Sequence, residues 1–375
     1  QKHQTSIMAA NYKLLSKFSV LPVDKFEGEC PYFRQPKQVG CFSLNEERLF
    51  LDDDSRLRFY SPPEVVNFDL RVGYQEFIRR DEEKKDRLDD MLRWIKKHPE
   101  TFTLSGDGGS QNDGSLHTDF VTWRGHMTKI LCTPYEKKES WQMALSLNKG
   151  TIYISEVETF EARQRRLNQS THQDEMSYWG YKFEDYVTQP RDQSKCKSIN
   201  EPINNNEAFC SVVRCRLDKH SLVYGAEVDC CIKNNSKSTK PPLNYIELKT
   251  SRIVENDRMQ HSFERYKLLK WWAQSFLAGI PKVICGFRND NGIVKKLKPF
   301  DTLGIPSLVS QSQSMWAGSV CLNFCNQMLS WVKSVVRDEG VVYMLHWREP
   351  FTHIELEVSK REDDVFLRDW YVTEG

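Results

Sequence analysis

The spacing of apolar residues along the chain predicts helices and strands that follow no strict alternation. Leu88, Met91, Leu92 and Ile95 recur at helical spacing and predict an amphipathic helix over 81–98. Runs rich in β-forming residues predict strands over 120–123, 141–147, 151–157, 209–217, 222–232, 245–250, 283–287, 341–347 and 353–358. Further helices are expected over 178–187, 262–278 and 323–336. This mixture favours an α+β fold, a single domain of mixed β-sheets flanked by helices.

The start of the chain shows no clear periodicity and carries Pro22 and Pro31. We therefore expect residues 1–32 to form an irregular segment ahead of one domain over 33–375. Residues 1–7 precede the first methionine and are either vector-derived or the end of a longer natural chain, so they are left out of the fold prediction.

Composition excludes two broad classes of protein. Hydrophobic residues make up 39% of the 375 positions and aromatic residues 12%, which is enough for a sizeable core and excludes wholesale disorder. The 53 basic and 52 acidic residues give a net charge of +1, which excludes a uniformly basic coat for duplex nucleic acid. A local basic groove beside an acidic site remains compatible with this balance.

The expected compartment follows from the apolar segments and the cysteines. The chain contains no run of about 18 apolar residues, and residues 1–20 lack the apolar core of a secretory signal, so we expect no membrane anchor. The eleven cysteines are an odd number without a signal peptide, which favours a reducing compartment over disulfides. Their spacings lack the paired CxxC pattern of a structural zinc site.

Two acidic motifs on neighbouring predicted strands carry the candidate chemistry. In GAEVDCC, Glu227 and Asp229 are two residues apart, so on a strand they leave from one face while Val228 points into the core. In YIELKT, Glu247 and Lys249 show the same spacing. Such carboxylates repel one another unless divalent cations bind between them, and Mg²⁺ and Mn²⁺ prefer oxygen ligands.

A pair of such cations can hold the attacking and leaving oxygens of a phosphodiester, with a lysine adding charge for the phosphate. A solvated strand face is the alternative, because Glu156 with Glu158 and Glu355 with Glu357 have the same spacing in this chain. The pattern alone leaves both interpretations open.

Three more residues fit this chemistry less specifically. Glu184 in GYKFE is expected near the start of a helix. Arg124 in VTWRGHMT could bind a phosphate through both guanidinium nitrogens, although such an arginine is more often a surface residue. On the helix expected over 262–278, Tyr266 is expected on the core face, and Lys267, Trp271 and Gln274 lie on another stripe. Either a phosphate site or a solvated face explains Lys267 and Gln274.

At these residues the sequence resembles the DXO family of decapping nucleases, whose core is similar to that of PD-(D/E)xK nucleases. The family's elements are an early Arg, a Gly-aromatic-x-aromatic-Glu segment, Glu-x-Asp, Glu-x-Lys and a later Gln. They occur here in order as Arg124 in TWRGHMTK, Glu184 in GYKFE, Glu227 and Asp229 in GAEVDC, Glu247 and Lys249 in IELKT, and Gln274 in WWAQSFL. The likeness extends from about Phe33 to Val372, nearly the whole chain.

The resemblance implies a quality-control hydrolase of RNA 5′ ends. Such an enzyme removes incomplete caps and nicotinamide-type (NAD) caps, releases pyrophosphate from 5′-triphosphate RNA, and degrades 5′-monophosphate RNA in the 5′ to 3′ direction. All these reactions can proceed by in-line attack of water on a phosphorus atom, assisted by bound metal ions. The expected cofactor is Mg²⁺ or Mn²⁺, with two ions, and the expected partner is the 5′ end of single-stranded RNA. A monomer in the nucleus, and also in the cytoplasm, is expected.

The resemblance also implies roles for individual residues. The metal ligands are expected to be Glu184, Glu227, Asp229, Glu247 and the backbone carbonyl of Leu248. The catalytic residues are expected to be Glu227, Asp229, Glu247, Lys249 and Gln274. Substrate contacts are expected from Arg124, Glu227, Lys249 and Gln274. Two alternatives remain: an RNA-end-binding partner or activator of an exoribonuclease with little catalysis of its own, and a DNA nuclease of the related PD-(D/E)xK type.

Overall fold

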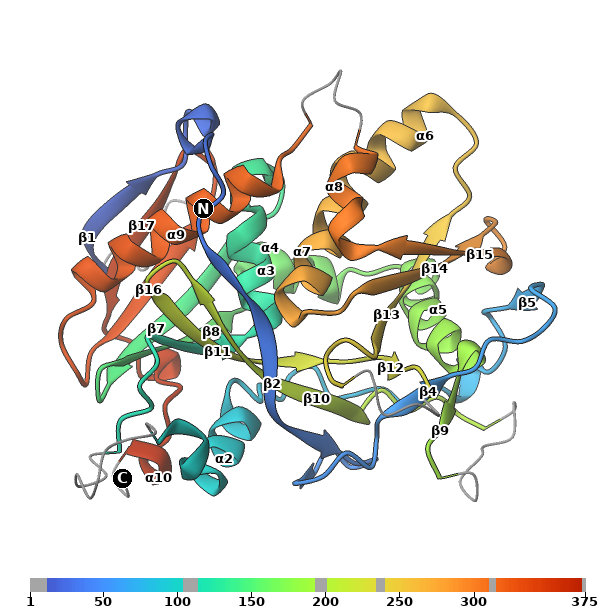
Figure 1. The fold of residues 1–375 in the computed structure, drawn as a ribbon, viewed down its shortest axis with the longest axis horizontal. Helices are drawn as coiled ribbons and strands as arrows, with labels where there is room; N and C mark the ends of the chain where they lie inside the picture. The colour runs from blue at the N-terminus through green and yellow to red at the C-terminus, as the bar shows by residue number, and fades with distance from the viewer. Residues whose placement is uncertain (1–11, 104–113, 193–200, 234–239, 310–314, 373–375) are drawn as a thin grey trace.

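The structure is a computed structural model. It describes residues 12–103, 114–192, 201–233, 240–309 and 315–372, so residues 1–7, which were set aside above, lie outside it. Two mixed β-sheets, flanked by helices, form the frame of the chain (Figure 1). The arrangement confirms the predicted α+β fold in a single domain. Within the described ranges, no helix is both long and apolar enough to cross a membrane.

The larger sheet is built from both ends of the chain. Its strands are, in spatial order, β1 (Tyr12–Ser19), β17 (His353–Ser359), β16 (Val342–Trp347), β7 (Trp141–Asn148), β8 (Thr151–Val157), β6 (Phe120–Trp123), β11 (His220–Glu227), β10 (Ala208–Leu217), β2 (Phe33–Leu44) and β3 (Phe50–Leu51). β6 pairs in parallel with both β8 and β11. The carboxyl ends of these three strands therefore lie at the same edge of the sheet.

The smaller sheet comes mostly from the middle of the chain. Its strands are, in spatial order, β5 (Phe68–Asp69), β15 (Ile293–Asp301), β14 (Lys282–Arg288), β13 (Tyr245–Arg252), β12 (Cys230–Cys231), β4 (Arg58–Tyr60) and β9 (Thr188–Pro190). β13 pairs in parallel with β14 and antiparallel with the short β12. The chain passes from the larger sheet to the smaller one between β11 and β12, near the centre of the view in Figure 1.

Helices cover both sheets. They are α2 (Asp89–Lys97), α3 (Arg124–Cys132), α4 (Phe160–Leu167), α5 (Thr171–Val187), α6 (Asp257–Ser262), α7 (Leu269–Ala278), α8 (Ile305–Leu308), α9 (Gly318–Val335) and α10 (Asp369–Val372). One hydrophobic cluster joins α3, α7 and α9 to one face of the larger sheet and to β14 and β15. α2 packs on the opposite face of the larger sheet, and α5 packs on the smaller sheet.

The N-terminal segment corrects one prediction. Residues 12–19, which were expected to be irregular, form β1, and β1 pairs antiparallel with β17 at the edge of the larger sheet. All eight residues of β1 are exposed or half-buried, so the sequence shows no alternation of buried and exposed positions here. Its conformation is stabilised by hydrogen bonds to β17, and a boundary at residue 33 would separate a strand from its sheet.

Two predicted helices differ in extent or phase. The helix expected over 81–98 begins only at Asp89. The helix expected over 262–278 starts earlier, at Asp257, and contains a π-helical segment, Phe263–Leu268. A π turn adds a residue and rotates the following side chains around the axis. Tyr266, predicted to face the core, is therefore 41% exposed, while Trp271, predicted on another stripe, is buried.

Candidate functional site

The two residues of the Glu-x-Asp motif lie where the chain changes sheets. Glu227 is the last residue of β11, and Asp229 lies just before β12, so the single strand predicted over 222–232 is interrupted here. Between them Val228 is buried, as predicted, in the cluster that joins the two sheets, and its amide donates to the carbonyl of Phe209. The buried Val228 therefore fixes the positions of both flanking carboxylates.

A backbone contact ties Asp229 to the Glu-x-Lys strand. The amide of Leu248 on β13 donates a hydrogen bond of 2.6 Å to Oδ2 of Asp229. In an extended strand the amide and carbonyl of one residue point to the same edge, so the carbonyl of Leu248 also faces the side of β13 on which Asp229 lies. The predicted backbone ligand therefore lies on the same side as the predicted carboxylate ligand.

Glu247 is buried between two cations. Its side chain is 1% exposed, Oε2 accepts from Nη1 of Arg124 at 2.8 Å, and Oε1 accepts from Nζ of Lys249 at 2.6 Å. Burial alone would raise the pKa of Glu247, but Arg124 and Lys249 outweigh it and lower this pKa to about 2. Glu247 is thus a carboxylate at neutral pH, and the structure brings together three of the predicted site residues.

Glu184 reaches the same site from α5. It lies in the last turn of that helix, where its carbonyl accepts from the hydroxyl of Thr188 at 2.7 Å, and not near a helix start as predicted. A capping box of Ser170 and Gln173 sets the start of α5 at Thr171. The Ser-x-x-Gln pattern is visible in the sequence and is the signal that would have placed Glu184 correctly.

The carboxylates repel one another strongly. Burial, followed by the charges of Asp229 and Glu227, raises the pKa of Glu184 well above its usual range. Burial and then Glu247 raise the pKa of Asp229 to about 7, against the opposing effects of Lys249 and Arg124. These four carboxylates therefore share a region in which Arg124 and Lys249 supply positive charge.

The donor set fits a hard divalent cation. In the described part of the chain, no group of three or more His, Cys, Asp or Glu side chains already has a metal-ligand arrangement. Carboxylate oxygens with a neighbouring backbone carbonyl are nevertheless the ligands that Mg²⁺ and Mn²⁺ prefer, and a cation would offset the repulsion among these groups. The residues fit the predicted metal by their chemistry.

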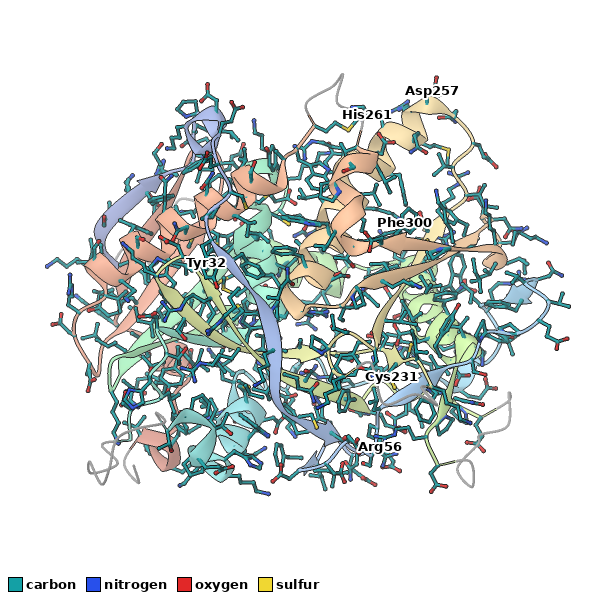
Figure 2. All side chains as sticks on the ribbon, viewed as in Figure 1. Tyr32, Arg56, Cys231, Asp257, His261 and Phe300 are labelled. Carbon is teal, nitrogen blue, oxygen red and sulfur yellow. The ribbon has the colours of Figure 1, made fainter. Side chains whose placement is uncertain are left out.

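Gln274 and two histidines stand apart from this group. Gln274 is half-buried on α7, and its amide has no hydrogen-bond partner among the described residues. His126 bonds Thr122 and the carbonyl of Ile154, and burial lowers its pKa to about 4. His261 lies exposed on α6, near Asp257 in Figure 2. The contacts in the structure therefore link none of these three side chains to the carboxylates.

A cavity of about 1760 Å³ opens onto the site. Glu184, Glu227 and Asp229 line it, whereas Arg124, Glu247 and Lys249 are not part of its wall. Other lining residues come from distant segments of the chain, so no local motif in the sequence indicates them. They include Gln142, Ser155, His346, Arg348 and Glu357.

Comparisons with known proteins identify the family of this chain. Residues 34–372 match the RAI1-like PD-(D/E)XK nuclease family. The decapping and exoribonuclease protein of Homo sapiens is 42% identical over 378 residues, which cover 98% of this chain and 93% of that protein. The crystal structure of Candida albicans Rai1 in complex with pU5 and Mn²⁺ has a TM-score of 0.79 and 26% identity, covering 93% of this chain and 95% of that one.

A second solved structure is similar over almost the same extent. Scheffersomyces stipitis Rai1, in complex with (3′-NADP)⁺ and a calcium ion, has a TM-score of 0.77 and 25% identity, covering 94% of each chain. The match of the family spans more than half of the chain, and the human relative exceeds 30% identity over nearly all of it. The chain therefore belongs to the RAI1-like PD-(D/E)XK nuclease family.

Proposed function

We propose that the protein is a metal-dependent hydrolase that acts at the 5′ end of single-stranded RNA. One observation supports the proposal most directly. Glu184, Glu227 and Asp229 line a large cavity. The buried group of Arg124, Glu247 and Lys249 lies close enough to interact electrostatically with these carboxylates. Carboxylates and fixed cations in one place are what in-line attack on a phosphorus atom requires.

Glu184, Glu227, Asp229, Glu247 and the carbonyl of Leu248 would hold Mg²⁺ or Mn²⁺, as two ions. Bound divalent cations there supply an activated water and neutralise the carboxylates. The number and identity of the ions are part of the proposal. Support comes from the manganese and calcium ions in the two Rai1 structures.

The chain's own cations and amide would position the substrate. Lys249 and Arg124 place positive charge beside Glu247, where each can also contact a phosphate oxygen of the scissile group. The amide of Gln274 bonds no other described residue, which leaves it able to donate to a phosphate or to orient water. Glu227 is exposed to the cavity and is available to substrate as well as metal.

The proposed range of RNA substrates is inferred from the relatives of this chain. The human relative is a decapping and exoribonuclease protein, and the two Rai1 proteins bind pU5 and (3′-NADP)⁺. We extend these properties to this chain as removal of incomplete caps and NAD caps, release of pyrophosphate from 5′-triphosphate RNA, and 5′ to 3′ decay of 5′-monophosphate RNA. We also propose a monomer in the nucleus, which rests on the family resemblance alone.

The test uses RNA with an unmethylated 5′ guanosine cap that is labelled in the cap. The protein with Mg²⁺ or Mn²⁺ should release an intact cap dinucleotide, and EDTA or Glu247→Gln should abolish this release. As a control, Glu255→Ala changes an exposed acid three residues after the end of β13 and should leave the release unchanged. Tight RNA binding without turnover would instead indicate the RNA-end-binding alternative, and cleavage of duplex DNA without preference for RNA ends would indicate a DNA nuclease.

A further inference from the structure

The cavity extends well beyond the carboxylates, along one face of the larger sheet. Gln142, Ser155, His346 and Glu357, which we call the polar row, line this far arm. They come from β7, β8, β16 and β17, and the pairing registers place all four side chains on the same face. From β11, which carries Glu227, to β16 there are four strand spacings, or roughly 19 Å.

The ionisable residues of the polar row, His346 and Glu357, have close neighbours that restrict their movement. His346 and Glu357 are both buried, and Nε2 of His346 lies 3.2 Å from Oε2 of Glu357. The other oxygen of Glu357 lies 3.2 Å from Arg348, and the proximity of His346 lowers the pKa of Glu357. Tyr12 packs edge-on against the His346 ring. Glu357 is thus a fixed, ionised acceptor at the end of the cavity.

The neutral half of the row has unused hydrogen-bonding groups. The hydroxyl of Ser155 is buried without a partner among the described residues, although Ser155 is only 1% exposed. The amide of Gln142 also has no partner among those residues. A buried hydroxyl without a partner costs folding free energy, so a ligand that bonds it recovers this cost.

The chemistry of the row selects a particular kind of ligand. Ser155 and the NH₂ of Gln142 can donate to a carbonyl oxygen, and Glu357 and the amide oxygen of Gln142 can accept from N–H groups. A phosphate would face the ionised Glu357 and is disfavoured there. An amide in a heteroaromatic base offers a carbonyl beside an N–H group, as in the lactam of guanine and the carboxamide of nicotinamide.

We propose that the polar row binds the amide-bearing base of a 5′ cap while the bond to be cleaved lies at Glu184, Glu227 and Asp229. The inference rests on the proposed function, and it adds a site to it. Ser155 on β8 and Gln142 on β7 lie two and three strand spacings from β11, or roughly 10–14 Å, which a 5′–5′ linked dinucleotide can span. The row then distinguishes capped ends, which reach it, from 5′-monophosphate ends, which do not.

The test compares Ser155→Ala and Gln142→Leu with Gln327→Leu, an exposed glutamine on α9. For each protein, kcat/KM is measured on RNA carrying a guanosine cap, an NAD cap, an adenosine cap or a 5′-monophosphate. Binding of the free dinucleotide GpppG and of NAD is measured by titration calorimetry. Thermal unfolding of the free proteins reports any structural effect.

We expect both row variants to lose about 3- to 10-fold in kcat/KM and in affinity on guanosine and NAD caps, as for one lost hydrogen bond. Activity on adenosine-capped and monophosphate RNA should not change, because those ends present no amide to the row. Ser155→Ala should be as stable as the parent or more stable, since it removes an unpartnered hydroxyl. A loss on guanosine alone would assign the row to the lactam, and a loss on NAD alone to the carboxamide.

An equal loss on monophosphate RNA, or no loss on any substrate, would overturn the inference. If the parent protein turns over no RNA but binds GpppG in a manner that depends on the polar row, the proposed function fails and the site stands. If it neither turns over RNA nor binds GpppG or NAD, both fail.

Discussion

Arg124 donates a hydrogen bond of 2.8 Å to Glu247 across 123 positions of the chain. Arg124 is the first residue of α3, directly after β6 in the larger sheet, and Glu247 lies on β13 in the smaller one. The ion pair therefore joins the two sheets at the site. It also means that a phosphate which contacts Arg124 competes with a buried carboxylate.

The first prediction concerns the stability that this pair contributes. Arg124→Ala leaves Glu247 buried with Lys249 as its single cation, so we expect the free energy of unfolding to fall by about 2 kcal/mol. Urea denaturation in EDTA measures the change. Arg163→Ala, which removes a pair between exposed side chains, should cost less than about 0.5 kcal/mol. Equal losses in the two variants would contradict a buried, structural ion pair.

A second prediction concerns metal binding without turnover. Because the carboxylates repel one another, Mn²⁺ added to EDTA-treated protein should raise Tm by roughly 3 °C or more at saturating concentration. Asp229→Asn should raise Tm in EDTA, since it removes one charge, and should lose most of the Mn²⁺ effect. Asp290→Asn, at an exposed acid, should keep the parent response. A parent-like Mn²⁺ shift in Asp229→Asn would show that the ion binds elsewhere.

The two acidic motifs were predictable because their signals are local. Period-two spacing and buried neighbours such as Val228 and Leu248 mark both acidic strands in the sequence, and both apolar residues are buried. The interruption after Glu227 was not predictable, because it depends on where the chain leaves one sheet for the other. The helix pattern supported Gln274 only weakly, and among the described residues no contact connects its side chain to the carboxylates.

The polar row shows the opposite case. Glu355 and Glu357 have the spacing of a solvated strand face, yet Glu357 is buried and faces His346. Its environment is set by β1, β16 and β17, which come from opposite ends of the chain. No local sequence pattern specifies the order of strands in a sheet. Neither the burial of Glu357 nor the strand at residues 12–19 could therefore be predicted from the sequence.

A third prediction uses the pH dependence of stability. Burial opposes ionisation of Glu355, but bonds from Lys17, Arg348 and His353 outweigh it and lower the pKa of Glu355 from 4.5 to about 2. A lowered pKa of a carboxyl contributes stability above pH 4.5 that is lost as pH falls toward 2. Glu355→Gln should therefore lower the free energy of unfolding by about 1–2 kcal/mol at pH 7, after allowance for solvent screening.

Urea unfolding at pH 7, 5 and 3 tests the direction of this pH dependence of stability. The difference between Glu355→Gln and the parent should be constant from pH 7 to 5 and should shrink at pH 3. Glu161→Gln, at an exposed residue of α4, should differ little from the parent at every pH. A difference that grows as the pH falls would contradict the assignment.

The last prediction links packing to the position of Glu184. A Cβ at Gly286 on β14 would come within 2.4 Å of the ring of Phe183, the residue before Glu184, whereas a Cβ at Gly180 on the same helix meets nothing within 4 Å. Gly286→Ala must therefore displace Phe183 or α5, at a cost of about 1–3 kcal/mol, and should reduce metal-dependent RNA hydrolysis. Gly180→Ala should instead stabilise α5 by about 0.5–1 kcal/mol and leave the activity unchanged. Urea unfolding and cap release are measured on both variants, and full activity of Gly286→Ala despite its lost stability would show that the position of Glu184 does not depend on this contact.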